Sequence, residues 1–137
     1  MIGIINNMGF TMVQAGSSAI AEAFGKKSLM GYFLFLMKGS GVISRYVNGA
    51  CCVNISHIRR MLMVTVFSIF SFLLIAIAAE NTQDILFFYV ALFSSIFMGI
   101  AQSFGEACVL GFLKAFPLNM ISDFASGLGF SGPFSTV

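Results

Sequence analysis

Long apolar runs separated by short polar turns divide the chain into segments of the length that a membrane-spanning helix needs. Residues 61–79 and residues 85–105 are apolar runs without a charged side chain. Each matches the roughly 20 residues with which a helix crosses a hydrocarbon core of about 30 Å. The polar, acidic residues 80–84 lie between these runs and predict a turn that joins two helices into a hairpin.

Three other apolar segments carry more polar residues, and they cover residues 3–23, 29–53 and 120–137. The first has no charge before Glu22, and the second is interrupted by Lys38 and Arg45. We therefore predict an all-α transmembrane protein with four spans and an incomplete fifth, in one domain over residues 1–137. Since the chain opens almost within its first span and stops within its last, we expect it to be part of a longer protein.

The composition excludes an ordinary soluble domain. Hydrophobic residues make up 58% of the chain and charged residues only 9%, against about 25% charged residues in a typical soluble domain. A chain of 137 residues cannot bury so many apolar side chains in one aqueous core, because small domains keep much of their surface wet. Lipid must therefore be the solvent for much of the chain. The net charge of +2 gives no indication of a nucleic-acid partner.

Polar residues of the first segment share one helical face. Asn7, Thr11, Gln14, Ser18 and Glu22 follow i, i+4, i+7, i+11, i+15 spacing, which places all of them on the same side of a helix. They could be hydrogen-bonding groups that hold helices together, or one wall of a polar pathway. A face with five polar residues favours the pathway, and both interpretations stay open.

The second segment carries two cations on one face. Lys38, Gly41, Arg45 and Asn48 follow i, i+3, i+7, i+10 spacing. Lys38 and Arg45 could attract an anionic group into a cavity. Alternatively, Arg45 lies near the end of the segment and could extend its charged group to the lipid headgroups. Lys38 lies deeper in the segment, and extension to the headgroups therefore explains Lys38 less well.

A small residue recurs every four positions in the fourth segment, namely Ser95, Gly99, Ser103, Ala107, Gly111 and Ala115. Such a face lets a neighbouring backbone approach closely, and we interpret it as a helix-packing surface. Beside it lie Gln102 and Glu106, one turn apart. Acidic groups within a membrane are costly and usually face a bundle interior or a watery cavity. Glu106 could pair with Lys38 or Arg45 and hold helices together, or it could carry a transported proton.

The last segment is rich in glycine over residues 126–133 and includes Pro133. Within a membrane, we interpret this stretch as a closely packed, bent helix whose freed backbone groups can face a cavity. It does not fit a phosphate-binding loop, because no Lys followed by Ser or Thr comes after the glycines.

The residues for common catalytic and metal sites are missing from the sequence. His57 is the only histidine, and Cys51, Cys52 and Cys108 lack the spacing of a zinc site. No Ser-His-Asp set or pair of catalytic carboxylates can be assembled. We therefore expect no enzyme activity, no metal and no cofactor.

Several short motifs match, in order, those of one known family. Residues 3–7 read Gly-Ile-Ile-Asn-Asn, and residues 17–19 read Ser-Ser-Ala. Arg59 or Arg60 stands ahead of the third span. A later set comprises Gly105-Glu106, Phe112-Leu113, Ala115-Phe116, Ile121-Ser122 and Ser126-Gly127, with Gly129 and Gly132. Together these residues resemble the N-terminal portion of the battenin family of lysosomal and vacuolar membrane proteins, over nearly all of this chain.

The resemblance implies a major-facilitator-like helical bundle, of which this chain would be the N-terminal part. It also implies a role in organellar pH homeostasis and in the transport of small solutes, such as basic amino acids or glycerophosphodiesters. One stretch departs from the family pattern, because residues 37–40 read Met-Lys-Gly-Ser where the family has an acid and a Pro ahead of a basic residue. Arg45 fits the basic position, but its changed neighbours leave the substrate open.

We therefore expect a battenin-like, multi-pass transporter of the lysosomal or vacuolar membrane. Its partners would be the lipid bilayer, a small-molecule substrate, protons, and the remainder of the transporter fold. The expected substrate pathway or charge-coupling residues are Asn7, Gln14, Lys38, Arg45, Gln102 and Glu106. The alternative is a membrane adaptor or trafficking factor that transports nothing and acts through its cytosolic loops. A third possibility is that this short chain is inert by itself.

Overall fold

Helices form the whole regular structure of the part of the chain that the computed structural model describes, which comprises residues 2–51, 55–81, 84–114 and 118–135. These are α1 (Ile2–Ala23), the 3-10 helix η1 (Lys27–Leu29), α2 (Met30–Cys51), α3 (His57–Glu80), α4 (Ile85–Leu113) and α5 (Leu118–Ser135). The described ranges contain no strand. The predicted all-α class is confirmed, whereas a major-facilitator-like arrangement remains a prediction.

Two helices, α3 and α4, are long and apolar enough to cross a membrane. They contain the two apolar runs without charge that the sequence shows. α3 begins at His57, ahead of its apolar run, and α4 continues past Gly105 to Leu113. α2 is one continuous helix in spite of Lys38 and Arg45. Membrane crossing by α1, α2 and α5 stays a prediction.

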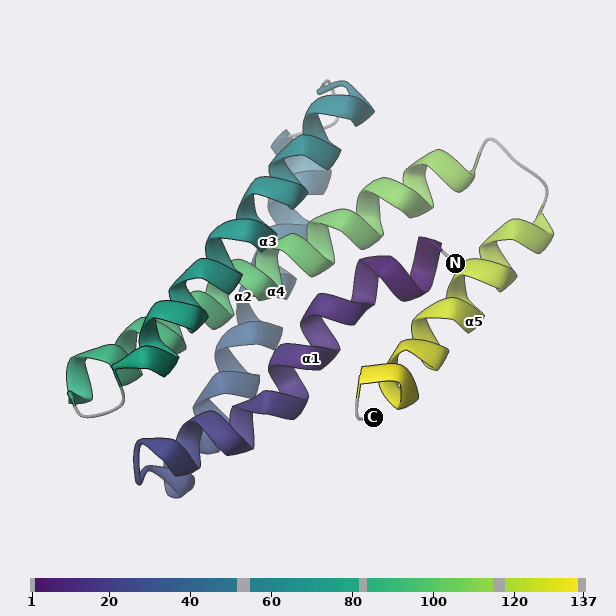
Figure 1. The fold of residues 1–137 in the computed structure, drawn as a ribbon. Helices are drawn as coiled ribbons and strands as arrows, with labels where there is room; N and C mark the ends of the chain where they lie inside the picture. Colours follow the sequence, from purple (N-terminus) through teal and green to yellow (C-terminus); the bar gives the residue numbers. More distant parts are fainter. Residues whose placement is uncertain (1, 52–54, 82–83, 115–117, 136–137) are drawn as a thin grey trace.

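The helices pack side by side, with α3 and α5 at opposite edges of the bundle and α4 and α1 between them (Figure 1). α4 packs against both α2 and α3, whereas α5 packs mainly against α1. The bundle thus consists of a group of three helices, α2, α3 and α4, and a pair, α1 and α5. Contacts of α1 with α4 and, to a smaller extent, with α2 hold the pair to the group.

Small residues bring α2 and α4 into close contact. A β-carbon on Gly99 of α4 would collide with the carbonyl of Met37 and with the Ser40 side chain. Similarly, a β-carbon on Gly41 of α2 would collide with the Ser103 hydroxyl. Backbone approach of this kind is what small residues allow at helix contacts in membranes.

Apolar side chains fill the spaces between helices and also cover the outside of α3. One cluster joins Phe10 and Val13 of α1 to Met37 of α2 and Met98 of α4. α3 leaves a large apolar surface exposed, which includes Leu62, Val66, Ile69, Phe70, Leu73 and Ile77. Exposed apolar surface of this extent is rare on soluble monomers, and it suits a helix that faces lipid.

Candidate functional site

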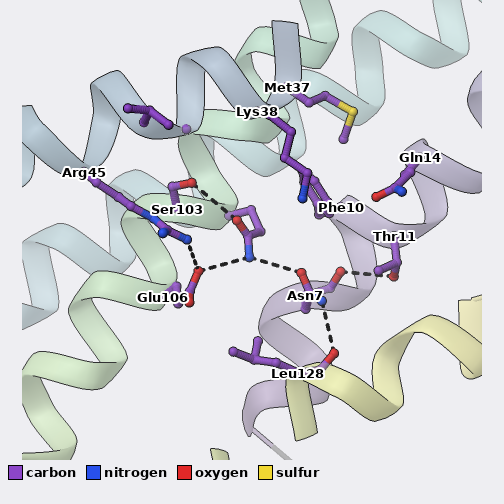
Figure 2. A pocket seen from close by; sticks show the side chains of 13 residues that line it. Asn7, Phe10, Thr11, Gln14, Met37, Lys38, Arg45, Ser103, Glu106 and Leu128 are labelled. Carbon is purple, nitrogen blue, oxygen red and sulfur yellow. Dashed lines mark hydrogen bonds and ion pairs between the residues drawn. The ribbon is translucent and has the colours of Figure 1, made fainter. Parts of the chain in front are cut away.

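A polar cavity of about 420 Å³ lies between α1, α2, α4 and α5 (Figure 2). All of the residues that the sequence predicts for a pathway line it, namely Asn7, Gln14, Lys38, Arg45, Gln102 and Glu106. Its volume is within the range of about 300–1,000 Å³ that is common for small-molecule sites. The structure therefore brings three separately predicted polar faces to one place.

Glu106 forms an ion pair with Arg45 across the cavity. The Arg45 Nη2 atom lies 2.6 Å from the Glu106 Oε2 atom. The Glu106 side chain is 20% exposed and the Arg45 side chain 56% exposed, so solvent screens the pair mainly on its Arg45 side. Of the two cations that the sequence offers to Glu106, the structure pairs it with Arg45.

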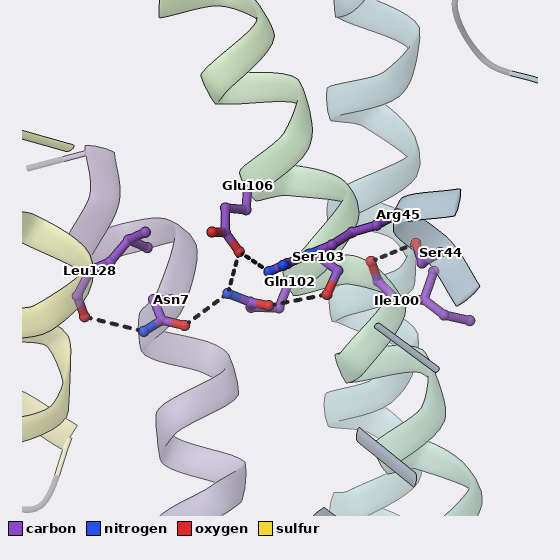
Figure 3. A network of polar contacts seen from close by, with 8 residues as sticks. All are labelled: Asn7, Ser44, Arg45, Ile100, Gln102, Ser103, Glu106 and Leu128. Carbon is purple, nitrogen blue, oxygen red and sulfur yellow. Dashed lines mark hydrogen bonds and ion pairs between the residues drawn. The ribbon is translucent and has the colours of Figure 1, made fainter. Parts of the chain in front are cut away.

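Gln102 extends this ion pair into a network that crosses the bundle (Figure 3). Its Nε2 atom donates to Glu106 Oε2 at 3.4 Å and to Asn7 Oδ1 at 3.1 Å. Its Oε1 atom accepts a hydrogen bond of 3.4 Å from the Ser103 hydroxyl. Both ends of the Gln102 amide are therefore occupied, which fixes the orientation of the side chain.

Asn7 continues the network from α1 to α5. Its Nδ2 atom donates to the Ser131 hydroxyl at 2.8 Å and to the Leu128 carbonyl oxygen at 3.3 Å. A continuous series of polar contacts thus runs from Arg45 on α2 through Glu106 and Gln102 on α4 to Asn7 on α1, and ends on α5. Polar side chains on four helices are linked by it, and its loss would loosen contacts between all of them.

Lys38 is the second cation in the cavity, and it has a different environment. Its Nζ atom lies 4.5 Å from the centre of the Phe10 ring, in a cation–π contact. Among the described residues, no carboxylate forms an ion pair with Lys38. The cavity therefore holds one cation whose charge is balanced by Glu106 and one for which the described part of the chain provides no carboxylate partner.

The predicted polar face of α1 divides into two parts. Thr11 and the exposed Gln14 line the cavity together with Asn7, whereas Ser18 and Glu22 do not. The Ser18 hydroxyl donates to the Ala15 carbonyl of its own helix. Glu22 forms an exposed ion pair of 2.7 Å, from its Oε1 atom to Lys27 Nζ, in the turn after α1. Of the five residues on this predicted face, the last two thus lie outside the cavity, because the helix leaves the cavity before it reaches them.

The predicted packing stripe of α4 also divides. Its first three members, Ser95, Gly99 and Ser103, are buried, and Gly99 and Ser103 contact α2. Ala107 is partly buried, and Gly111 is exposed near the His57 ring at the start of α3. Ala115, the last member, lies outside the described residues.

Sequence reasoning missed Phe10, Ser131 and the Leu128 carbonyl as parts of the site. Phe10 follows Asn7 by three positions, so it shares the polar face, but an aromatic residue there gives no polar signal. Ser131 lies in the glycine-rich stretch, where freed backbone groups were expected to face a cavity. In the same stretch, the Leu128 carbonyl oxygen accepts a hydrogen bond from Asn7 beside the cavity.

No group of three or more His, Cys, Asp or Glu within the described ranges could hold a metal ion.

Comparison with known proteins gives one relative. No protein-family model matches the chain, and no solved structure matches it. Battenin of Dictyostelium discoideum is 30% identical to it over 131 residues, which cover 96% of the chain. The chain spans only 30% of the length of that relative. Over nearly its whole length, the chain is thus related to the battenin family.

Proposed function

We propose that the chain forms one wall of the solute pathway in a battenin-like transporter of the lysosomal or vacuolar membrane. One observation carries the proposal: polar and charged residues from three separate segments line one cavity between the helices. Ionisable residues among apolar helices are costly, and they commonly mark substrate or ion pathways. The similarity to a battenin supports the proposed family. The cavity supports transport over an adaptor role, because an adaptor needs no polar interior.

The charges that line the cavity favour a small anionic solute. Arg45 is balanced by Glu106, whereas Lys38 lies over Phe10 without a carboxylate partner among the described residues. A solute with one negative charge, such as a glycerophosphodiester, would balance Lys38. A basic amino acid would instead be repelled by Lys38 unless it displaced Arg45 from Glu106.

Glu106 is suited to couple solute movement to protons. If Glu106 takes up a proton, Arg45 loses its ionic partner and becomes a second cation for a bound anion. Loss of the proton re-forms the pair and removes that cation from the solute. Proton and solute movement would then be linked, and the rocking of helix bundles common in secondary transporters would supply the access. A contribution to organellar pH homeostasis would follow from this link.

The test is uptake by the complete protein in vesicles, with radiolabelled glycerophosphoglycerol and, separately, arginine. We expect an inward proton gradient to speed uptake of the anion, and Glu106→Gln to remove this dependence. The rate of anion uptake by Glu106→Gln under this gradient should be about tenfold lower than that of the wild-type protein, which corresponds to about 1.4 kcal/mol in the barrier. Glu80→Gln is the matched control, because Glu80 is exposed at the far end of α3.

Each result decides a different part of the proposal. Unchanged uptake and pH dependence in Glu106→Gln would contradict the coupling role of Glu106. Uptake of arginine but not of the anion would reverse the assignment of the substrate. Uptake of neither solute by the wild-type protein would contradict transport of both, and would favour the adaptor alternative.

A further inference from the structure

A second cavity of about 420 Å³ forms a groove between α2, α3 and α4, separate from the polar cavity. α2 contributes Val47, α3 contributes Met63 and Phe67, and α4 contributes Ile100 and Phe104. Ile55, just ahead of α3, also lines it. None of these residues lines the polar cavity, so the groove is separate from the proposed solute pathway.

Among the described residues, the groove offers a ligand almost no polar group. Its polar side chains are Ser40 and Ser44, and both hydroxyls already donate to backbone carbonyls. The Ser40 hydroxyl donates to Met37 at 3.1 Å, and the Ser44 hydroxyl donates to Ile100 at 3.4 Å. A ligand that fits here must therefore be apolar over the length of the groove, because a polar group would lose its hydrogen bonds to water.

The two ends of the groove differ, and one of them carries positive charge. Towards the middle of the bundle lies Ser40 of α2, which packs against Gly99 of α4. At the other end, Ile55 marks the start of α3, where Arg60 Nε donates to the Ile55 carbonyl oxygen at 3.0 Å. The groove thus extends from the middle of the bundle to the end of α3 that carries Arg59 and Arg60.

Arg59 lies on the same face of α3 as the groove. Arg59, Met63 and Phe67 are spaced by four residues, which places them above one another on a helix. Arg59 is exposed. No Asp or Glu occurs in the sequence between residues 30 and 79, so neither α2 nor the first 23 residues of α3 carry a carboxylate near this arginine. An anionic group is therefore the complementary partner for this end of the groove.

We propose that this groove binds one acyl chain of an anionic membrane lipid, with the lipid headgroup beside Arg59. An acyl chain matches the apolar lining, and its length allows it to reach from the headgroup level towards the middle of the bundle. α3 is long and apolar enough to cross the membrane, and Arg59 lies in its first turn. Basic residues at that level attract anionic headgroups. This inference does not depend on transport through the polar cavity.

The test is photolabelling of the complete protein in phosphatidylcholine vesicles. The vesicles contain a small fraction of phosphatidylglycerol with a diazirine near the end of one acyl chain, or the matched diazirine phosphatidylcholine. We expect the label to attach to the parts of α2 and α3 that line the groove. The labelling there should be several-fold stronger with the phosphatidylglycerol probe than with the phosphatidylcholine probe. Arg59→Gln should reduce this labelling to the level of phosphatidylcholine. Lys114→Gln is the matched control, because Lys114 is exposed at the same end of the bundle but away from the groove.

A second pair of variants tests the groove itself. Val47→Phe fills the groove and should reduce labelling by either lipid several-fold, whereas Val66→Phe on the exposed face of α3 should not. Equal labelling of the wild-type groove by the two lipids would overturn the assignment of an anionic headgroup. Labelling that Val47→Phe leaves unchanged, or no labelling at all because other parts of the protein cover the groove, would overturn the proposal.

Discussion

Gln102 is the residue on which the polar network of the cavity depends most. Its amide joins Glu106 on one side to Asn7 on the other, and its carbonyl oxygen accepts from Ser103. The ion pair of Glu106 with Arg45 does not need Gln102, but the connection of that pair to α1 does. Gln102 therefore links the charged part of the site to the helices α1 and α5.

Replacing Gln102 with Met should lower the stability of the protein, although the substitution preserves the side-chain volume. Asn7 Oδ1 would lose its donor in a partly buried place, and such losses cost about 1–3 kcal/mol. The measurement is the thermal unfolding temperature of the purified protein in detergent. Gln14→Met is the control, because Gln14 is exposed at the same cavity. Equal effects of the two substitutions would contradict a linking role for Gln102.

At the scale of helices, the contact between α2 and α4 positions both cavities. Gly99 allows the two backbones to meet at Met37 and Ser40, next to Lys38 of the polar cavity and at the part of the apolar groove that Ser40 lines. Any side chain at Gly99 would force α2 away from α4. The distance between Arg45 and Glu106 depends on the same contact, because these two residues lie on the same two helices.

Gly99→Ala should therefore destabilise the protein, whereas Gly39→Ala should not. The added methyl group at Gly99 meets backbone and side-chain atoms, and overpacking typically costs about 1–3 kcal/mol. Gly39, in the middle of α2, has open space, and alanine there should stabilise the helix by roughly 0.5–1 kcal/mol. Denaturation in detergent measures the free energy of unfolding of both variants. A neutral Gly99→Ala would show that α2 and α4 do not need this close approach.

At the scale of the whole molecule, the bundle consists of two parts, and fewer contacts join them than hold each part together. α5 packs mainly on α1, and the pair is attached to the other three helices chiefly through α1 and α4. A β-carbon on Gly3 of α1 would collide with the carbonyl oxygen of Phe124 in α5. The hydrogen bonds between Asn7 and α5 lie one turn further along α1.

We expect Gly3→Val to loosen α5 without loosening α3 and α4. Hydrogen exchange of the backbone amides should become faster in α5, because this helix has few other contacts and local opening follows local contacts. Exchange in α3 and α4 should stay as in the wild-type protein, since α3 packs mainly on α4, and α4 packs mainly on α3 and α2. Gly16→Val is the control on the same helix, where the new side chain has open space. Faster exchange in all five helices would contradict a division into two parts.

Much of the helical structure could be predicted from the sequence, because the signals for it are local. The length of an apolar run determines whether a helix can cross lipid, and the spacing of polar residues determines which of them share a face. These two signals predicted the all-α class and the five helical segments. The cost of a charge among apolar residues marked Lys38, Arg45 and Glu106, and the structure places all three at one cavity.

The sequence by itself thus determined the helices, their apolar character and the chemistry of each polar face, because those depend on neighbours along the chain. Only the tertiary structure decided that Glu106 pairs with Arg45, that Ser18 and Glu22 lie outside the cavity, and that Ser131 completes the network. It also decided where the apolar groove lies. The physical reason is that these features depend on how helices cross and rotate against one another, and those angles are set by close contacts between residues far apart in the sequence, such as Gly99 with Met37.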